Sequence, residues 1–487
     1  MRSSVSQTTL RDASTALVGR RLKETILNHA PTRLRPMLGL ATLAMIWGPA
    51  LAQDTSVGRV NADAKADAQG AWHSGQALMD DSHLSLHLRH LYKAGTNTPD
   101  AGLPPNYHTS VQAASLDFTS GYWAETLGFD LSYDTALNIS TGTDASGFTD
   151  GTLPRHPASF SRIGEHVVKL KWQGDGTQFK SRIGLQKVSN MGMLHARDSR
   201  ALEKLYNGAR LDGTQGAWSG LVAVVDATMD RNETFKRRFT TAKGTAVDYL
   251  ATAQIKWEPQ KNRSLLYFTG AAPHYVMREG LEGVWQADPA QKGSLKAEGF
   301  LYHNRALSVW QQENANARRG FDRNAYHAAI RLSAQVDKTF VQGGTTYTHA
   351  PNSNPNGMGF FEYNIARNAV GRFASPAYNG MIDYMYHREL MAFGMATQAL
   401  TREFGVGAAA YYGSGMKFKG VGLAHGDVMV FVEYKPELIK GLHTVVAYDW
   451  SRNWREVQGA PDVSQGRQLN ASKTGPMIRL DYRHEFF

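Results

Sequence analysis

The sequence contains no cysteine among its 487 residues, so disulfide bonds and thiolate metal sites are excluded. Beyond Ala52 it also lacks any run of about 18 apolar residues, which excludes a transmembrane helix in that part of the chain. Disorder is excluded in turn, because 42% of the residues are hydrophobic and 10% are aromatic. A mean hydropathy of −0.40 is compatible with a soluble protein and also with a membrane barrel, whose strands are apolar on one face only.

The charge pattern gives no sign of a nucleic-acid surface. Lysine and arginine number 53 against 43 aspartates and glutamates, a net charge of +10. Seven of the basic and two of the acidic residues fall within 1–52, so the remainder carries 46 basic and 41 acidic residues. This small excess is spread along the chain rather than clustered, and no nucleic-acid partner is expected.

Motifs for catalysis, cofactors and metals are missing as well. No H-E-x-x-H, P-loop or G-x-S-x-G pattern occurs. The stretch GVGAAA at 405–410 comes near a dinucleotide fingerprint, but it lies within an alternating apolar segment and is better explained as a strand of small residues. The 17 histidines show no metal-ligand spacing, and a lone one such as His327 is expected to be a hydrogen-bonded wall residue. We therefore predict no catalytic residue, no cofactor and no metal.

The first 52 residues have the features of an export signal. Arg33 and Arg35 precede the apolar stretch MLGLATLAMIWGPALA, whose core covers 37–47 and which ends in an A-x-A site. We expect 1–52 to be an N-terminal extension and signal peptide with cleavage after Ala52; the alternative is an uncleaved N-terminal anchor. The small and polar residues of 53–81 predict a flexible periplasmic leader.

Alternation of apolar and polar residues with a period of two recurs from Ser82 onward, and turn signals separate the segments. In NAYHAAIRLSAQVD, Tyr326 and Ile330 share one face, and His327 and Arg331 share the other. The segments HLSLHLRHL, ETLGFDLSYD, VVKLKW, DVMVFVEY and GLHTVVAYDW alternate in the same way. Several apolar faces end in tyrosine or tryptophan, as an interfacial aromatic girdle requires.

This pattern predicts an all-β fold, a transmembrane antiparallel β-barrel over 82–487. A soluble β-sandwich, which also alternates apolar and polar residues, is the alternative. The export signal, the many strands without a domain break, and the glycines and long basic residues on the polar face favour the barrel. A closed barrel also satisfies every backbone group inside lipid.

The last segment, GPMIRLDYRHEFF, is predicted to be the strand that closes the barrel. Arg479 and Asp481 would face a water-filled lumen. The opposite, lipid-facing parity holds Ile478, Leu480, Tyr482 and Phe486. Phe487 lies one position beyond that parity. A terminal aromatic residue resembles the signal by which barrel assembly machinery recognises its clients, so this machinery and outer-membrane lipid are expected partners.

Four separated stretches resemble the OprD family of bacterial outer-membrane porins. They are LDFTSGYWAETLGFDLSYD at 116–134, GTLPRHPASFSRIGEHVVKLKW at 151–172, MLHARDSRALEKLYNGARL at 193–211 and YNGMIDYMYHRELMAFG at 378–394. With the first and last strands, the resemblance covers about 80–487. It implies the bacterial outer membrane, an antiparallel barrel of 18 strands, and loops folded inward to narrow the pore.

The third stretch supplies candidate constriction residues by this resemblance. Its Asp-Ser-Arg motif is similar to the family's pore-folded loop, which implies a role there for Arg197, Asp198, Ser199 and Arg200. Tyr206 is expected to pack that loop against the wall. The family usually continues the motif with Leu-Leu-Pro, whereas this chain reads DSRALEK, so its constriction loop departs from the family at 201–204.

Strand parity adds basic candidates for the pore lining. The basic residues that lie opposite an apolar face are Lys169, Lys171, Arg182, Arg331 and Arg479. Arg89 and Arg483 share this parity but lie near predicted strand ends, where we expect headgroups or water around them. For each wall residue, the alternative to substrate contact is wall packing through ion pairs.

The resemblance implies selective uptake of small carboxylate-bearing nutrients: organic acids, aromatic acids or amino acids. A carboxylate that leaves water needs charged donors at each step, and arginine can bind it with two parallel hydrogen bonds. The hypothesis is therefore a substrate-selective porin for small anionic or zwitterionic solutes. The first alternative is a non-selective or structural barrel. The second is an outer-membrane hydrolase.

Overall fold

The computed structural model describes residues 76–97, 106–143, 152–154, 156–174, 176–196, 198–288, 293–315, 317, 319–379, 382–455, 461–462, 467–468 and 473–487. The predicted signal peptide, its cleavage site and most of the predicted leader lie outside these residues. The end of the predicted leader forms the helix α4 (Gln76–Asp80), so regular structure begins before the predicted start of the barrel. Among the residues that the structure describes, no helix is long and apolar enough to cross a membrane.

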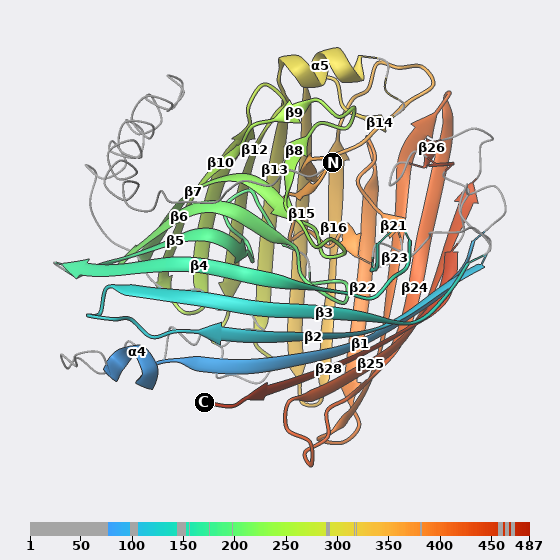
Figure 1. Cartoon of the computed structure of the whole chain (residues 1–487). Coiled ribbons are helices and arrows are strands. Elements are labelled where there is room, and N and C mark those ends of the chain that lie inside the picture. The colour runs from blue at the N-terminus through green and yellow to red at the C-terminus, as the bar shows by residue number, and fades with distance from the viewer. Residues whose placement is uncertain are drawn as a thin grey trace, which may run out of the picture. The chain divides into compact units, whose positions relative to one another are not determined.

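Eighteen long strands form the ring of the main sheet (Figure 1). They are β1 (His83–Asn97), β2 (Asn106–Thr119), β3 (Leu127–Thr143), β4 (Phe160–Gly174), β5 (Thr177–Lys187), β6 (Leu205–Gln215), β7 (Trp218–Met229), β10 (Leu250–Gln260), β11 (Arg263–Ala272), β12 (Val276–Gln286), β13 (Leu295–Ala306), β15 (Asn324–Val336), β16 (Thr339–His349), β22 (Leu390–Ala399), β23 (Phe404–Phe418), β24 (Val421–Tyr434), β25 (Leu442–Arg455) and β28 (Lys473–Glu485). Each pairs antiparallel with the next, and β28 pairs with β1, which closes the ring. The short strands β8 (Arg237–Thr240) and β9 (Ala246–Val247) extend the sheet from β7. The predicted 18-stranded barrel is confirmed.

The alternation predicted from the sequence sets the two faces of the wall. On β15, Ile330 is 56% exposed on the outer face, whereas His327 is fully buried on the inner face. Large apolar residues are exposed in the same way on most of the other long strands, so the outer wall carries an apolar surface around the ring. A soluble sandwich would bury such a face, whereas a barrel in lipid presents it.

The two ends of the barrel differ in the length of their connections. At one end, pairs such as β4–β5 and β15–β16 are joined by only two residues, 175–176 and 337–338. The other end carries long connections, including 188–204 and 350–389. Because short turns face the periplasm in bacterial barrels, the long-loop end faces the exterior. Large exposed aromatic residues mark both ends of the outer wall, among them Trp172, Trp257 and Trp285 at the short-turn end and Tyr326, Tyr347 and Trp450 at the long-loop end.

The first and last strands meet at the short-turn end. The backbone N–H of Leu84 donates to the carbonyl oxygen of Phe487 at 3.2 Å, and the N–H of Phe486 donates to the carbonyl oxygen of Leu84 at 2.9 Å. Phe487, whose parity did not fit the lipid face, thus continues the ladder beyond β28 with its side chain exposed.

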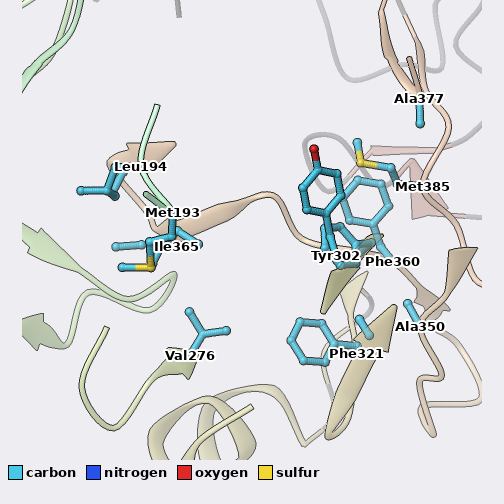
Figure 2. Packing of buried hydrophobic residues seen from close by; sticks show 14 of the residues in the cluster. Met193, Leu194, Val276, Tyr302, Phe321, Ala350, Phe360, Ile365, Ala377 and Met385 are labelled. Carbon is cyan, nitrogen blue, oxygen red and sulfur yellow. The ribbon is translucent and has the colours of Figure 1, made fainter. Parts of the chain in front are cut away.

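Shorter elements lie in the long connections. They are β8 (Arg237–Thr240), β9 (Ala246–Val247), α5 (Ser308–Asn314), β14 (Arg319–Gly320), β17 (Met358–Gly359), β18 (Asn364–Ala366), β19 (Ala369–Val370), β20 (Tyr378–Asn379), β21 (Ile382–Asp383), β26 (Pro461–Asp462) and β27 (Arg467–Gln468). Several of them belong to the β16–β22 loop (350–389), which also supplies much of the main hydrophobic cluster. That cluster packs this loop against the inward residues of the neighbouring strands, so the core of the molecule lies inside the ring (Figure 2).

Candidate transport pathway

Two loops meet inside the barrel and narrow it. The β5–β6 loop (188–204) and the β16–β22 loop form a bridge between Leu194 and Gly371. The N–H of Arg372 donates to the carbonyl oxygen of Met193 at 2.7 Å, and the N–H of His195 donates to that of Val370 at 3.0 Å. The inward-folded loops implied by the family resemblance are therefore present.

Buried guanidinium groups hold the β16–β22 loop on the wall. Arg278 of β12 is fully buried and donates to the carbonyl oxygen of Tyr363 at 2.8 Å, to that of Glu362, and to Oδ1 of Asn304 at 2.7 Å. A Cβ atom at Gly371 would collide with this guanidinium, which explains the glycine there. A buried charge is costly unless it is fully hydrogen-bonded, so these contacts determine where the loop rests.

His327 joins the same loop to β15 and β16. Its Nδ1 lies 2.8 Å from the Thr348 hydroxyl and its Nε2 lies 2.7 Å from the Ser375 hydroxyl. Ser375 belongs to the β16–β22 loop, so the histidine is a hydrogen-bonded wall residue, as predicted. Among the described residues, no group of three or more histidine, aspartate or glutamate side chains is arranged to hold a metal ion.

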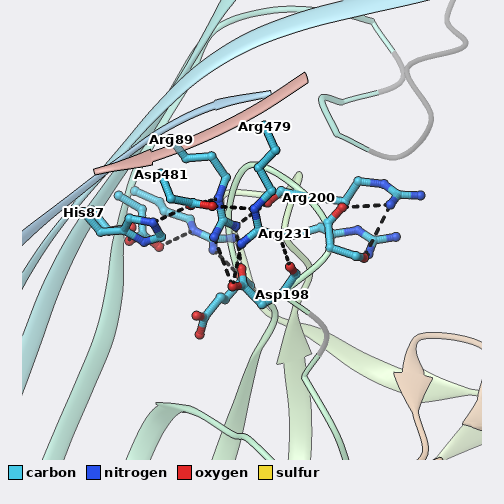
Figure 3. Close-up of polar contacts among 12 residues, drawn as sticks. His87, Arg89, Asp198, Arg200, Arg231, Arg479 and Asp481 are labelled. Carbon is cyan, nitrogen blue, oxygen red and sulfur yellow. Dashed lines mark hydrogen bonds and ion pairs between the residues drawn. The ribbon is translucent and has the colours of Figure 1, made fainter. Parts of the chain in front are cut away.

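The β5–β6 loop is held at the opposite side of the lumen by Asp198 (Figure 3). Its carboxylate receives hydrogen bonds from Arg89 of β1 and pairs with Nη2 of Arg479 of β28 at 3.1 Å. Asp481 of β28 in turn lies 2.6 Å from Nε of Arg89 and 2.8 Å from Nε2 of His87. We call these five residues the anchor cluster.

The anchor cluster corrects the prediction for Arg89. Its parity was predicted correctly, but it is 1% exposed rather than surrounded by headgroups or water, because the β5–β6 loop folds back over it. Arg483, by contrast, is exposed near the end of β28, as expected. Burial alone raises the pKa of the Asp198 carboxyl, but the hydrogen bond from Arg89 and the charges of Arg89 and Arg479 outweigh it, so this pKa lies below its ordinary value.

The remaining loop candidates have different surroundings. Arg197 lies outside the described residues. The Ser199 hydroxyl lies 3.4 Å from Nη1 of Arg200 and 3.5 Å from Nη1 of Arg231, a residue of the β7–β10 connection that the sequence did not single out. Tyr206 lies on β6 and is fully buried; its hydroxyl accepts from the N–H of Val370 at 3.1 Å and lies 3.3 Å from the carbonyl oxygen of His195, so this wall residue contacts both loops.

The segment that departs from the family pattern is largely buried. Ala201 and Leu202 belong to a small hydrophobic cluster with wall residues of β2 and β3. Nζ of Lys204 lies 3.1 Å from Asp230 and donates to the carbonyl oxygen of Asn368 at 2.8 Å. The residues at 201–204 therefore affect mainly the contacts that hold the β5–β6 loop, and less the surface that this loop presents to a solute.

Three of the basic candidates belong to one strip on β4–β6. In the ladder, Lys169 lies opposite Arg182, which lies opposite Arg210; Lys171 lies opposite Lys180. We call these five residues the basic strip. Lys180 and Arg210 were not predicted, although the two-residue connection between β4 and β5 fixes the register that brings Lys180 beside Lys171.

Carboxylates neutralise part of the basic strip. Asp130 lies 2.9 Å from Lys169 and 2.8 Å from Arg182, and Glu165 lies 2.9 Å from Arg182. Lys169 is 1% exposed, so its charge is enclosed in the wall. The ammonium groups of Lys169 and Lys171 also lie 4.8 and 5.5 Å from the centre of the Tyr122 ring.

The last two wall candidates lie apart from the strip. Arg479 belongs to the anchor cluster. Arg331 lies on β15, where its Nε is 2.7 Å from Glu298 and its guanidinium lies over the Phe300 ring at 5.2 Å. The structure therefore does not bring all five predicted basic residues into a single row.

Comparisons with known proteins agree with this architecture. The sequence model described as outer membrane porin, OprD family, matches residues 76–348, more than half of the chain. No curated protein matches the sequence. Among solved structures, OccAB1 of Acinetobacter baumannii is similar with a TM-score of 0.68 and 16% identity over 85% of this chain and 100% of that one.

Two channels of Pseudomonas aeruginosa are similar to the same degree. OccK9 (OpdG) has a TM-score of 0.67 and OpdK one of 0.66, each with 14% identity over 84% of this chain and 100% of the other. OpdK has also been crystallised with vanillate. The sequence match, the closed ring of 18 strands and the apolar outer surface together show that the chain belongs to the OprD family of outer membrane porins.

Proposed function

We propose that this porin is a substrate-selective channel for small solutes that carry a carboxylate, whether organic acids, aromatic acids or amino acids. The observation that carries the proposal is the basic strip. Asp130, Glu165 and Asp212 pair with three of its members, Lys169, Arg182 and Arg210, and Lys171 and Lys180 add two further basic side chains to the same inward surface. A basic inward surface lowers the barrier for an anion that has lost part of its water.

The position of the strip suits the exit of the channel. Lys171 and Lys180 lie near the two-residue connection of β4 and β5, at the short-turn end, and both are half-buried rather than enclosed. A solute that passes the two loops would meet these side chains next. Weak, successive contacts of this kind allow binding without preventing release.

Partial neutralisation of the strip also supports selectivity rather than simple attraction. Nε and Nη2 of Arg210 lie 2.6 and 2.5 Å from the two carboxylate oxygens of Asp212. A solute carboxylate must compete with such internal partners, which favours ligands with matched geometry. The vanillate bound to the structurally similar OpdK is an aromatic carboxylate, in keeping with this chemistry.

The experiment compares a carboxylate with its uncharged amide of nearly equal size, in liposome uptake and in planar bilayers. Wild-type protein should pass the carboxylate faster. The double variant Lys180→Gln/Arg210→Gln should lose most of that preference, and Lys435→Gln, which changes an exposed lysine in the connection between β24 and β25, should keep it. Equal permeation of both solutes through the wild-type protein would instead support a non-selective barrel. We propose no catalytic role, in keeping with a family of porins.

A further inference from the structure

A row of aromatic rings crosses the outer wall at its long-loop end. His303 of β13 stacks on Tyr326 of β15 with ring centres 4.6 Å apart, and Tyr326 lies 6.4 Å from His349 of β16. His387, in the segment before β22, meets His349 at 5.0 Å. We call these four residues the ring row. Tyr326 and His349 are exposed, which places the row on the outer surface of the barrel.

Two exposed arginines lie at the two ends of the ring row. Arg305 follows His303 on the outward face of β13, and Arg388 follows His387. Among the described residues, neither guanidinium forms a hydrogen bond or an ion pair. This differs from arginines inside the barrel such as Arg278 and Arg372, each of which is held by several acceptors.

Internal contacts hold the histidine rings in place and do not involve the two guanidinium groups. The two nitrogens of His303 face Glu279 at 3.4 Å and Asn324 at 3.0 Å. Nδ1 of His387 accepts from the N–H of Ala350 at 3.1 Å, and the N–H of Arg388 donates to the carbonyl oxygen of Thr348 at 2.8 Å. The rings therefore form a fixed platform, and the charged groups beside it are open to a ligand.

The position of the platform identifies that ligand. Toward the middle of the barrel, the same outer faces carry Leu301, Ile330 and Tyr347, which are 50, 56 and 46% exposed and belong to the lipid-facing surface. The ring row follows directly beyond them at the exterior end, at the level of the lipid headgroups. Arginine binds phosphate with a pair of hydrogen bonds, and basic clusters at this level bind anionic headgroups.

We propose that Arg305 and Arg388, together with the ring row, form a binding site for the phosphate groups of a lipid in the outer leaflet. The register separates the two arginine backbones by three strand spacings across the sheet and by two residues along the strands, about 16 Å in all. That distance suits a headgroup with two phosphates, one at each arginine, with the sugar or glycerol portion lying over the rings. The site lies on the outer wall and takes no part in the lumen.

The test is native mass spectrometry of the folded porin in detergent. Wild-type protein, the double variant Arg305→Gln/Arg388→Gln and the control Arg452→Gln are each titrated with a diphosphorylated glycolipid, with the same lipid lacking its phosphates, and with inorganic phosphate. Arg452 is the control, because it is exposed on the outward face of β25 at the same end of the barrel, where its aromatic neighbours Tyr448 and Trp450 are not part of the ring row. Heat-dependent gel mobility verifies that every variant is folded.

We expect wild type and Arg452→Gln to retain the diphosphorylated lipid, and the double variant to bind it roughly tenfold to thirtyfold more weakly. The lipid without phosphates should bind all three proteins alike. Undiminished binding by the double variant would overturn the proposal, as would wild-type binding that does not depend on the phosphates. Displacement of the lipid by an equal concentration of inorganic phosphate would also overturn it, because the site would then be one for a free anion.

Discussion

The lumen of this porin is organised differently on its two sides. Along β10–β23, the β16–β22 loop packs on the wall through a large cluster of buried aromatic and aliphatic residues, with arginines such as Arg278 as fixed points. Along β28 and β1–β6, the wall carries ion pairs, and the β5–β6 loop contacts it through Asp198. The first side is filled and the second is polar, and we propose from this difference that a solute passes along the ion-paired wall.

The largest expected effect is the loss of packing on the filled side. Phe360 is fully buried and meets Tyr386 edge to face at 5.7 Å. Phe360→Ala should lower the free energy of unfolding by about 3–5 kcal/mol, because it leaves a cavity and loosens the β16–β22 loop. Urea unfolding followed by tryptophan fluorescence measures this. Tyr347→Ala, on the lipid-facing surface, is the control and should cost clearly less; equal losses would contradict the assignment of the core to the lumen.

The second prediction concerns the anchor cluster. Asp198→Asn removes the charge that pairs Arg89 and Arg479 with the β5–β6 loop, so the loop should move and the open-channel current should become noisier, with a higher mean conductance. Single-channel recording measures both quantities. Because Arg89 keeps Asp481 as a partner, the barrel itself should stay folded. A variant with wild-type noise would show that the loop is held by its other contacts alone.

The same carboxyl predicts a dependence on pH. Since its pKa is lower in the folded protein than in the unfolded chain, the stabilisation is present above the ordinary aspartate value and is lost as the pH falls through the folded-state pKa. Channel noise in the wild type should therefore stay constant down to a pH of about 4 and rise below it. Asp198→Asn should be noisy at every pH and lack this transition; a transition of the same size in the variant would assign it to another group.

A smaller effect is expected from single changes in the basic strip. Lys180→Gln or Arg210→Gln alone should reduce the preference for a carboxylate over its amide by roughly twofold to fivefold, the range of a half-exposed charge interaction. Reversal potentials in a gradient of the carboxylate salt measure how strongly each variant still prefers the anion.

The smallest effect on selectivity is expected from Arg331→Gln. This residue points inward on β15, but it is paired with Glu298 and covered by the Phe300 ring, so the carboxylate preference should hardly change. The same reversal-potential measurement tests it. A loss as large as that of Lys180→Gln would show that solutes also pass along the filled side.

The sequence was sufficient for what depends on neighbouring residues. Alternation has a period of two, so the face of Ile330 or Arg89 can be assigned from the chain alone, and the assigned faces are correct. The alternation does not predict which side chains from distant parts of the chain meet inside the lumen. Asp198 meets Arg479, 281 positions further along the chain, only because the ring closes and the loop folds inward. The burial of Arg89 and the pairing of Arg331 depend on such distant contacts and could not be predicted in this way.

The seam between β1 and β28 has a consequence for assembly. Asp198 is held by Arg89 of the first strand and Arg479 of the last, and Asp481 of the last strand pairs with both arginines. These groups come together only after β28 and the residues that follow it, through Phe487, have paired with β1. An open sheet on the way to the finished barrel therefore lacks the anchor cluster, and the chain completes the fastening of its constriction in the same step that closes its wall.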